Sequence, residues 1–302
     1  MRIVVGLDDS AHSRATMEFL RALPWARRER WEIVSALHSP IAAYAPADPD
    51  HLGRAIEAAD AEARRQEAWL ADTERELHAA GVASHATLAE ADARTALVQA
   101  ARDLEADVVV VGFRGRSGID RLVLGSVASH VAVHAPCSVL VVKPPAHRLD
   151  FERRPMSLVL GVDESPCSQA AVDLVLRLTW PERVSMEVVT TLRPEVQSVD
   201  VTDGLHVGFA SSLVEESRVR REVAIRYERR LRDAGYRASM SATHGDPRER
   251  LVDAAADSGA DLLVVGSHGR TGLSKLLLGS VSSYALSHAP CSVLVVKPPR
   301  RT

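Results

Sequence analysis

Short runs of β-branched residues alternate with longer amphipathic stretches along this chain. Residues 2–6 and 108–111 are nearly continuous apolar runs, which are typical of strands buried on both faces of a sheet. Between such runs, apolar residues recur at helical spacing, as at Ala15, Phe19 and Ala22. The pattern therefore predicts a mostly parallel sheet with helices on both faces, a doubly wound, Rossmann-like α/β fold.

The first half of the chain carries one complete set of these elements. Its predicted strands are 2–6, 31–37, 83–88, 108–111 and 138–142, and its predicted helices are 13–22, 56–80, 93–105 and 126–134. The long second helix is rich in Ala, Glu and Arg, and Gly81 is expected to end it. The second half repeats the set, with strands at 157–161, 185–192, 238–243, 261–265 and 292–296 and helices at 170–178, 213–234, 248–258 and 280–288.

The two halves are also related in sequence. Residues 106–145 and 260–299 align without a gap, and 26 of these 40 positions are identical. A repeat this long indicates two whole domains rather than a solenoid. We therefore expect two tandem domains of five strands each, at 1–145 and 157–302, joined by an exposed charged linker at 146–156.

Composition places the chain among ordinary globular proteins. Its 302 residues are 46% hydrophobic and 25% charged, with a net charge of -3, so no overall positive field draws it to nucleic acid or anionic lipid. Three cysteines without a C-x-x-C pair predict neither a disulfide framework nor a zinc site. The first residues lack the apolar run of a secretory signal, and the apolar runs are far shorter than the ~20 residues of a membrane span. A soluble cytoplasmic protein is expected.

Each half carries a glycine-rich loop after its fourth predicted strand. The spacing G-x2-G-x9-G-S occurs at 112–126 and again at 266–280. Glycines let backbone amides approach an anion closely and permit positive φ angles, and a following helix start adds unpaired N–H groups. The duplicated loop therefore predicts two phosphate-binding sites. The alternative is that these glycines serve only turns and helix packing.

This spacing, with Asp8 upstream in Gly-Leu-Asp-Asp-Ser and Asp163 in Gly-Val-Asp-Glu-Ser, resembles the ATP-binding branch of the universal stress protein family in both halves. The resemblance implies that the Asp meets the adenosine part of ATP, ADP or AMP, while the loop holds ribose and phosphates. Mg²⁺ would arrive with the phosphates rather than at a dedicated metal site. The residues expected at the two nucleotide sites are Gly6, Asp8, Gly112, Arg114, Gly115, Arg116, Gly118, Gly125, Ser126 and Val127 in one half, and Gly161, Asp163, Gly266, His268, Gly269, Arg270, Gly272, Gly279, Ser280 and Val281 in the other.

The basic residues beside the two loops differ. Arg114 and Arg116 flank the middle glycine of the first loop, whereas His268 and Arg270 flank that of the second. Arginine suits phosphate because it presents paired N–H donors. These basic residues are therefore expected to contact phosphate, and the alternative is that they are exposed surface charges.

Two further stretches depart from the family's pattern. The G-x-P that often precedes the third helix is kept at 245–247 but reads Ala-Asp-Ala at 91–93. The L-H-V expected after the second strand reads Leu-His-Ser at 37–39 and Leu-Arg-Pro at 192–194. Proline removes a backbone donor that adenine recognition could use. These departures predict two sites that share phosphate binding and differ in base recognition.

Signatures of other nucleotide-binding and hydrolytic proteins do not occur. The chain has no G-x-x-x-x-G-K-[S/T], no G-x-G-x-x-G after the first strand, no S-G-G-x-D-S and no G-x-S-x-G. His134 and His288 are expected to end helices and to cap their carbonyls. Cys137 and Cys291 are expected to be small core residues, and Cys167 has no expected partner.

Two classes of function stay open at this stage. The favoured one is a nucleotide-dependent regulatory or stress-response module, and the other is a slow ATP hydrolase or phosphotransferase. Catalysis would need a positioned base near the γ-phosphate, but Asp120 in the first half becomes Ser274 in the second, so no acid recurs beside both loops. No catalytic residue is therefore assigned.

The last strand of each half indicates how the two halves could associate. An edge strand as apolar as 138–143 or 292–297 needs covering, and the resemblance implies that the two halves pair through them about a pseudo-two-fold axis. A homodimer of the whole chain stays open.

Segments 39–54 and 193–212 are least alike between the halves and are expected to be loops, with lids or partner surfaces as the alternative.

Overall fold

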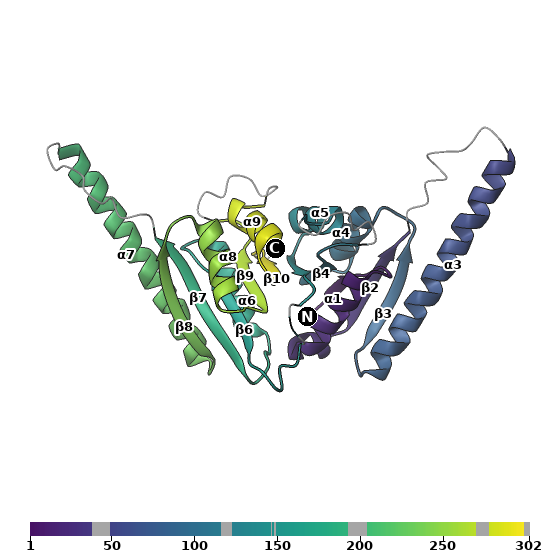
Figure 1. Ribbon diagram of the computed structural model, residues 1–302, viewed down its shortest axis with the longest axis horizontal. Coiled ribbons are helices and arrows are strands. Elements are labelled where there is room, and N and C mark those ends of the chain that lie inside the picture. The colour runs from purple at the N-terminus through teal and green to yellow at the C-terminus, as the bar shows by residue number, and fades with distance from the viewer. Residues whose placement is uncertain are drawn as a thin grey trace. The chain divides into compact units, whose positions relative to one another are not determined.

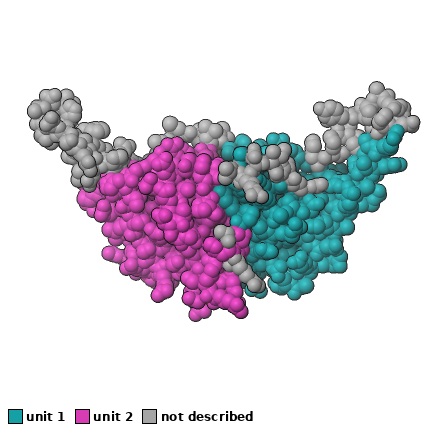
Figure 2. All heavy atoms as spheres, viewed as in Figure 1, with its two compact units in different colours: residues 1–144 teal, residues 145–302 magenta. Residues whose placement is uncertain are grey.

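The computed structural model describes residues 1–37, 49–115, 123–145, 147, 149–192, 204–269 and 278–298, and the side chains of 49–52 and 204–214 lie outside this description. The chain divides into two compact units, Met1–Pro144 and Pro145–Thr302 (Figure 2). Each unit is an α/β domain whose paired strands are all parallel. The predicted doubly wound fold, present twice in tandem, is confirmed.

The described residues of the first unit form five strands in the order β3-β2-β1-β4-β5. They are β1 (Ile3–Gly6), β2 (Trp31–Ala36), β3 (Ser84–Ala89), β4 (Val108–Gly112) and β5 (Ser138–Val142). The order reverses between β1 and β4, which pair with Gly6 opposite Val111. In a doubly wound sheet, ligands bind at the carboxyl ends of the strands beside such a reversal. The residues that follow Gly6 and Gly112 therefore flank the place where a ligand is expected.

Helices cover both faces of this sheet. They are α1 (Ala11–Ala22), α2 (Pro24–Arg27), α3 (Pro49–Ala79), α4 (Ala93–Asp103) and α5 (Ser126–His134). Two glycines show which helix lies on which face. A Cβ on Gly6 would meet the Leu97 side chain of α4, whereas one on Gly112 would meet His12 and Thr16 of α1. Gly112 lies one position beyond Val111, the partner of Gly6, so side chains at the two glycine positions would point to opposite faces of the sheet. Helices α1 and α4 therefore cover opposite faces.

The second unit repeats the arrangement in the order β8-β7-β6-β9-β10. Its strands are β6 (Met156–Gly161), β7 (Val184–Leu192), β8 (Arg237–His244), β9 (Leu262–Gly266) and β10 (Ser292–Val296), and its helices are α6 (Pro166–Arg177), α7 (Gly204–Asp233), α8 (Pro247–Asp257) and α9 (Ser280–His288). The long helix α7 runs beside β8 as α3 runs beside β3 (Figure 1). The order again reverses between β6 and β9.

Local chemistry accounts for the ends of the helices. Ser10 and Ser165 cap α1 and α6 by accepting a hydrogen bond from the amide three residues on. Gly81 and Gly235 follow the two long helices with φ of 77° and 91°, the left-handed region in which glycine lacks the penalty of a Cβ. The prediction that Gly81 ends its helix is confirmed.

The long helices begin earlier than the apolar pattern predicts. The stretches 49–54 and 204–212, expected as loops, are the first turns of α3 and α7, while 39–48 and 193–203 lie outside the described residues. The expectation was wrong because glycines within these stretches (Gly53, Gly204 and Gly208) disfavour a helix and hid where each helix begins. The short α2, with Pro24 at its start, was also missed.

Candidate functional site

Asp8 lies just beyond the carboxyl end of β1 and is held by a small network of hydrogen bonds. Its Oδ1 accepts from the Ser10 amide at 3.1 Å and from Ser13 Oγ at 2.7 Å. The Asp8 amide in turn donates to Ser13 Oγ at 2.8 Å. Since Ser13 is 4% exposed and sits in the first turn of α1, the helix fixes the orientation of the carboxylate.

The same network recurs around Asp163 in the second unit. Its Oδ1 accepts from the Ser165 amide at 2.9 Å and from Ser168 Oγ at 2.7 Å, and its own amide donates to Ser168 Oγ at 3.0 Å. The sequence signal for this arrangement is Asp-x-Ser-x-x-Ser, which occurs at the start of both halves. Sequence reasoning used the Asp and the first Ser but missed Ser13 and Ser168.

The fixed carboxylate faces the middle glycine of the loop in each unit. A Cβ added at Gly115 would lie 2.8 Å from Asp8 Oδ2, and one at Gly269 would lie 3.2 Å from Asp163 Oδ2. The first distance is closer than Cβ atoms approach other heavy atoms, and the second is tight. The first-strand Asp and the glycine loop, which are far apart in sequence, therefore meet at one place in each unit.

The outer glycines of the loop are required by close backbone packing. A Cβ at Gly112 would lie 3.1 Å from the Cβ of His12, and one at Gly266 would lie 2.7 Å from the Cβ of Cys167. Gly125 donates its amide to the Phe113 carbonyl at 2.9 Å, and a Cβ there would lie 3.0 Å from the same oxygen. Gly279 repeats this contact with Ser267.

Positive φ angles do not explain these glycines. Among the described residues, the glycines with positive φ are Gly81, Gly235, Gly245 and Gly259, and none belongs to either loop. At the described positions of the loops, the close approach of neighbouring atoms, rather than a positive φ, disfavours a side chain.

Each loop leads into a helix whose N-terminus has no side-chain cap. Gly125 is the N-cap of α5 and Gly279 that of α9, and neither cap makes a side-chain hydrogen bond. The first amides of a helix lack intrahelical partners and lie at the positive end of its dipole. Ser126 and Ser280 occupy the first helical position and are exposed, and the next residues, Val127 and Val281, are half-buried. An anion on the loop would meet free amide donors here.

Gly6 and Gly161 are also predicted site residues, and the structure gives them a packing role. A Cβ on Gly6 would lie 2.8 Å from the Leu97 side chain of α4, and one on Gly161 would lie 2.6 Å from Leu251 of α8. Small residues at these strand ends let α4 and α8 pack closely. Contact of either glycine with a nucleotide stays a prediction.

Arg114 and His268 hold equivalent positions but make different contacts. Arg114 donates from Nε to the Val123 carbonyl at 2.8 Å, with its guanidinium 5.4 Å from the Phe113 ring centre, while its Nη2 is buried without a hydrogen-bond partner. His268 Nδ1 instead lies 3.2 Å from Ser267 Oγ. Arg114 therefore spans the loop and keeps one buried donor available. Arg116, Gly118, Arg270 and Gly272 lie outside the described residues, as do Asp120 and Ser274.

The turns before α4 and α8 are capped alike although their sequences differ. Asp92 accepts from the Arg94 amide at 3.0 Å, and Asp246 accepts from the Arg248 amide at 2.9 Å. The side-chain hydrogen bond from Arg94 or Arg248 lowers the pKa of its Asp to about 2. Gly245 has a φ of 134°, which favours glycine, whereas Ala91 is not among the described residues with positive φ. The departure at 91–93 therefore alters the backbone of the turn but not the cap.

Several sequence expectations concern histidine and cysteine. His134 and His288 end α5 and α9, and His288 Nδ1 lies 3.0 Å from the Tyr284 carbonyl, consistent with a capping role. Cys291 is buried and Cys137 is half-buried. Cys167 is buried and forms no disulfide, and its Sγ lies 3.7 Å from Ser267 Oγ.

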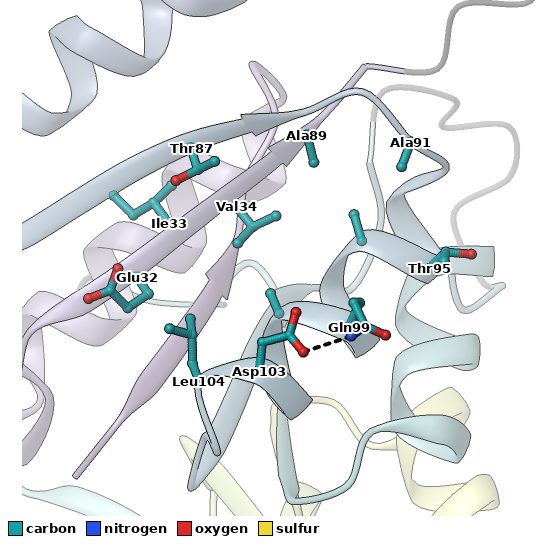
Figure 3. A pocket seen from close by; sticks show the side chains of 12 residues that line it. Glu32, Ile33, Val34, Thr87, Ala89, Ala91, Thr95, Gln99, Asp103 and Leu104 are labelled. Atoms are coloured by element: carbon teal, nitrogen blue, oxygen red, sulfur yellow. Dashed lines mark hydrogen bonds between the residues drawn. The ribbon is translucent and has the colours of Figure 1, made fainter.

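Two cavities lie away from the glycine loops. One, of about 400 Å³, sits between β2, β3 and α4 and is lined by groups such as Val34, Thr87 and Thr95, with the Gln99–Asp103 hydrogen bond at its edge (Figure 3). The other, of about 610 Å³, lies beside Ser157 and the first residues of β7 and β8. Neither is lined by a predicted nucleotide-site residue.

Other kinds of site find no support in the part of the chain that the structure describes. Within it, His, Cys, Asp and Glu side chains form no group of three or more that could hold a metal ion. Its helices also include none that is long and apolar enough to span a membrane.

Comparison with known proteins relates the whole chain to one family. The model of the universal stress protein family matches residues 1–143 and 156–297. A universal stress protein of Mycolicibacterium smegmatis is 30% identical over 98% of this chain and 97% of its own length.

Solved structures agree at the level of the fold. A universal stress protein from Archaeoglobus fulgidus aligns with a TM-score of 0.65 at 17% identity, covering 98% of each chain. A putative universal stress protein from Pseudomonas aeruginosa aligns with a TM-score of 0.65 at 15% identity, covering 99% of this chain and 94% of its own. This chain belongs to the universal stress protein family and carries the family's domain twice.

Proposed function

We propose that each unit binds one adenine nucleotide, ATP or its di- or monophosphate, and that occupancy of the two sites makes the protein a nucleotide-dependent regulatory module in a stress response. The phosphates would lie on the glycine loop and the N-terminus of α5 or α9. The adenosine part would lie against Asp8 or Asp163.

The observation that carries the proposal is the meeting of three features in each unit. A fixed carboxylate faces a glycine at which a side chain would be crowded, and the loop leads into a helix start that lacks a side-chain cap. Unpaired backbone amides at the positive end of a helix favour an anion, and glycines let it come close. A carboxylate beside that anion site suits a ligand with a hydroxyl-bearing part attached to its phosphates, as in a nucleotide.

The chemistry of the donor set also fits a metal that arrives with the ligand. Mg²⁺ is commonly held by substrate phosphates, waters and one or two carboxylates rather than by an all-protein cage. Because His, Cys, Asp and Glu side chains of the described residues form no group of three or more that could hold a metal ion, Mg²⁺ would be held mainly by the phosphates of the nucleotide and by water.

The experiment compares bound nucleotide in the parent chain and in a Gly115→Leu, Gly269→Leu double variant. Purified protein is extracted with acid, and adenine nucleotide is separated by chromatography and counted per chain. We expect nucleotide in the parent and none in the double variant, since each new side chain would fill the space between loop and carboxylate.

A matched control is Gly53→Ala, because a Cβ at this exposed position of α3 meets nothing within 4 Å. This variant should keep its nucleotide. Circular dichroism must show that the double variant stays folded. Equal nucleotide content in a folded double variant would contradict the proposal.

A further inference from the structure

His12 marks a chemical difference between the two candidate sites. It lies in the first turn of α1, half-buried, with its Cβ 3.1 Å from where a Cβ on Gly112 would be. The equivalent residue of the second unit, Cys167, packs in the same way against Gly266. One site therefore has an imidazole beside its glycine loop, and the other has a buried thiol.

The charged groups that act on His12 both belong to the candidate site. Burial is the larger cause that lowers the pKa of His12 below its ordinary value, and the positive charge of Arg114 lowers it further. Asp8 acts in the opposite direction and only partly offsets them. The N-terminal end of α1 also disfavours a cation in its first turn. Without a ligand, the imidazole is therefore mainly neutral at pH 7.

We propose that His12 is a ligand-binding residue of the first unit, whose imidazole takes up a proton as the phosphates bind, so that nucleotide affinity at this site rises as the pH falls. This inference rests on the proposed function of the same loop. The phosphates would bring negative charge to the loop beside which His12 and Arg114 lie, and their attraction to an imidazolium would outweigh the effect of the arginine.

Linkage fixes the direction and the size of the effect. If bound phosphate raises the pKa of His12, affinity increases as the pH falls through the pKa of the complex and levels off below the pKa of the free protein. A difference of one unit between these two pKa values corresponds to a tenfold change in affinity. We expect His12 to contribute about a threefold to tenfold increase between pH 8 and pH 5.5.

The test uses the full chain with Asp163→Ala, so that binding reports the first site. ATP is titrated calorimetrically from pH 5.5 to 8.5, in two buffers of different ionisation enthalpy, to obtain both affinity and proton uptake. The same titrations are made with the His12→Gln and His12→Cys variants of this chain. His12→Cys introduces the residue type that the second unit has at the equivalent position. Because the terminal phosphate of ATP also titrates near pH 6, the difference between parent and variants is the measured quantity.

The expected result is a proton uptake on ATP binding and a rise in affinity at low pH that are both larger in the parent than in either variant. Adenosine, which lacks phosphate, should show no such difference. ATP binding with the same pH profile and proton uptake in parent and variants would overturn the role of His12 while leaving the proposed function intact. Absence of ATP binding at every pH, with both units folded, would overturn the proposed function itself.

Discussion

Replacing Ser13 with alanine tests whether the network around Asp8 shapes the first site. The substitution removes the hydroxyl that donates to Asp8 Oδ1 at 2.7 Å and accepts from the Asp8 amide at 2.8 Å. Hydrogen bonds to charged groups contribute about 1.5–3 kcal/mol, and Ser13 is buried enough that water replaces its hydroxyl poorly. Because Asp8 itself is only half-buried, we expect a loss of about 2 kcal/mol in the free energy of unfolding of the first unit.

Urea unfolding followed by tryptophan fluorescence measures this loss. Trp25, Trp31 and Trp69 lie in the first unit, so the signal reports mainly its unfolding. With a slope of roughly 2 kcal/mol per molar urea, the midpoint should fall by roughly 1 M. Ser129→Ala, at an exposed position of α5 in the same unit, should change the free energy of unfolding by less than about 0.5 kcal/mol.

The same variant should weaken nucleotide binding, because a carboxylate freed from Ser13 must be ordered again when the ligand binds. Calorimetric titration without urea, at a temperature at which the variant is fully folded, separates this effect from unfolding. Unchanged stability and unchanged affinity after Ser13→Ala would refute the reasoning that the helix positions the carboxylate.

Three further predictions address pairing, site inequality and pH. Leu140→Pro, in the apolar last strand of the first unit, should expose apolar surface and increase the binding of a hydrophobic dye. If residues 1–145, expressed alone, stay a stable monomer at high concentration, the predicted pairing of the two halves is wrong. Calorimetry of Asp8→Ala and Asp163→Ala chains should give unequal affinities for the two surviving sites, by about threefold to tenfold if one hydrogen bond to the base is lost, and matching affinities and enthalpies would defeat this claim. The Arg94 side chain lowers the pKa of Asp92 to about 2, so the stability from this pair is present above about pH 4 and is lost as the pH falls toward 2; acid unfolding of Asp92→Asn should lack that component.

The sequence predicts the fold well because its main signals are strong and duplicated. Short apolar runs indicated the central strands, and the alternation of strands with helices indicated the more polar β3 and β8, so that the ten strands of the described residues were all expected. The repeat indicated two domains of one kind. Segments 49–54 and 204–212 were misread because glycines in the early turns of α3 and α7 disfavour a helix. Pro49 was a missed signal, since proline is common at the first position of a helix.

The candidate site could be predicted by motif but not in its inner detail. Spacing identified Asp8 and the glycine loop, whereas only coordinates show that Gly115 must be a glycine because the Asp8 carboxylate occupies the adjoining space. Ser13 was visible as part of a repeated Asp-x-Ser-x-x-Ser pattern, yet a serine in a helical turn carries no signal of its partner. Cys167 stands in the place of His12 in the second half, so the repeat could not identify the histidine.

Binding stoichiometry tests the central claim most directly. Nucleotide-free protein is titrated with ATP by calorimetry, as the parent chain and as the single variants Gly115→Leu and Gly269→Leu. Two nucleotides per parent chain and one per single variant are predicted, since each glycine lies against the carboxylate of its own unit. Two nucleotides bound by either folded single variant, or none bound by the parent, would contradict the assignment of one nucleotide site to each unit.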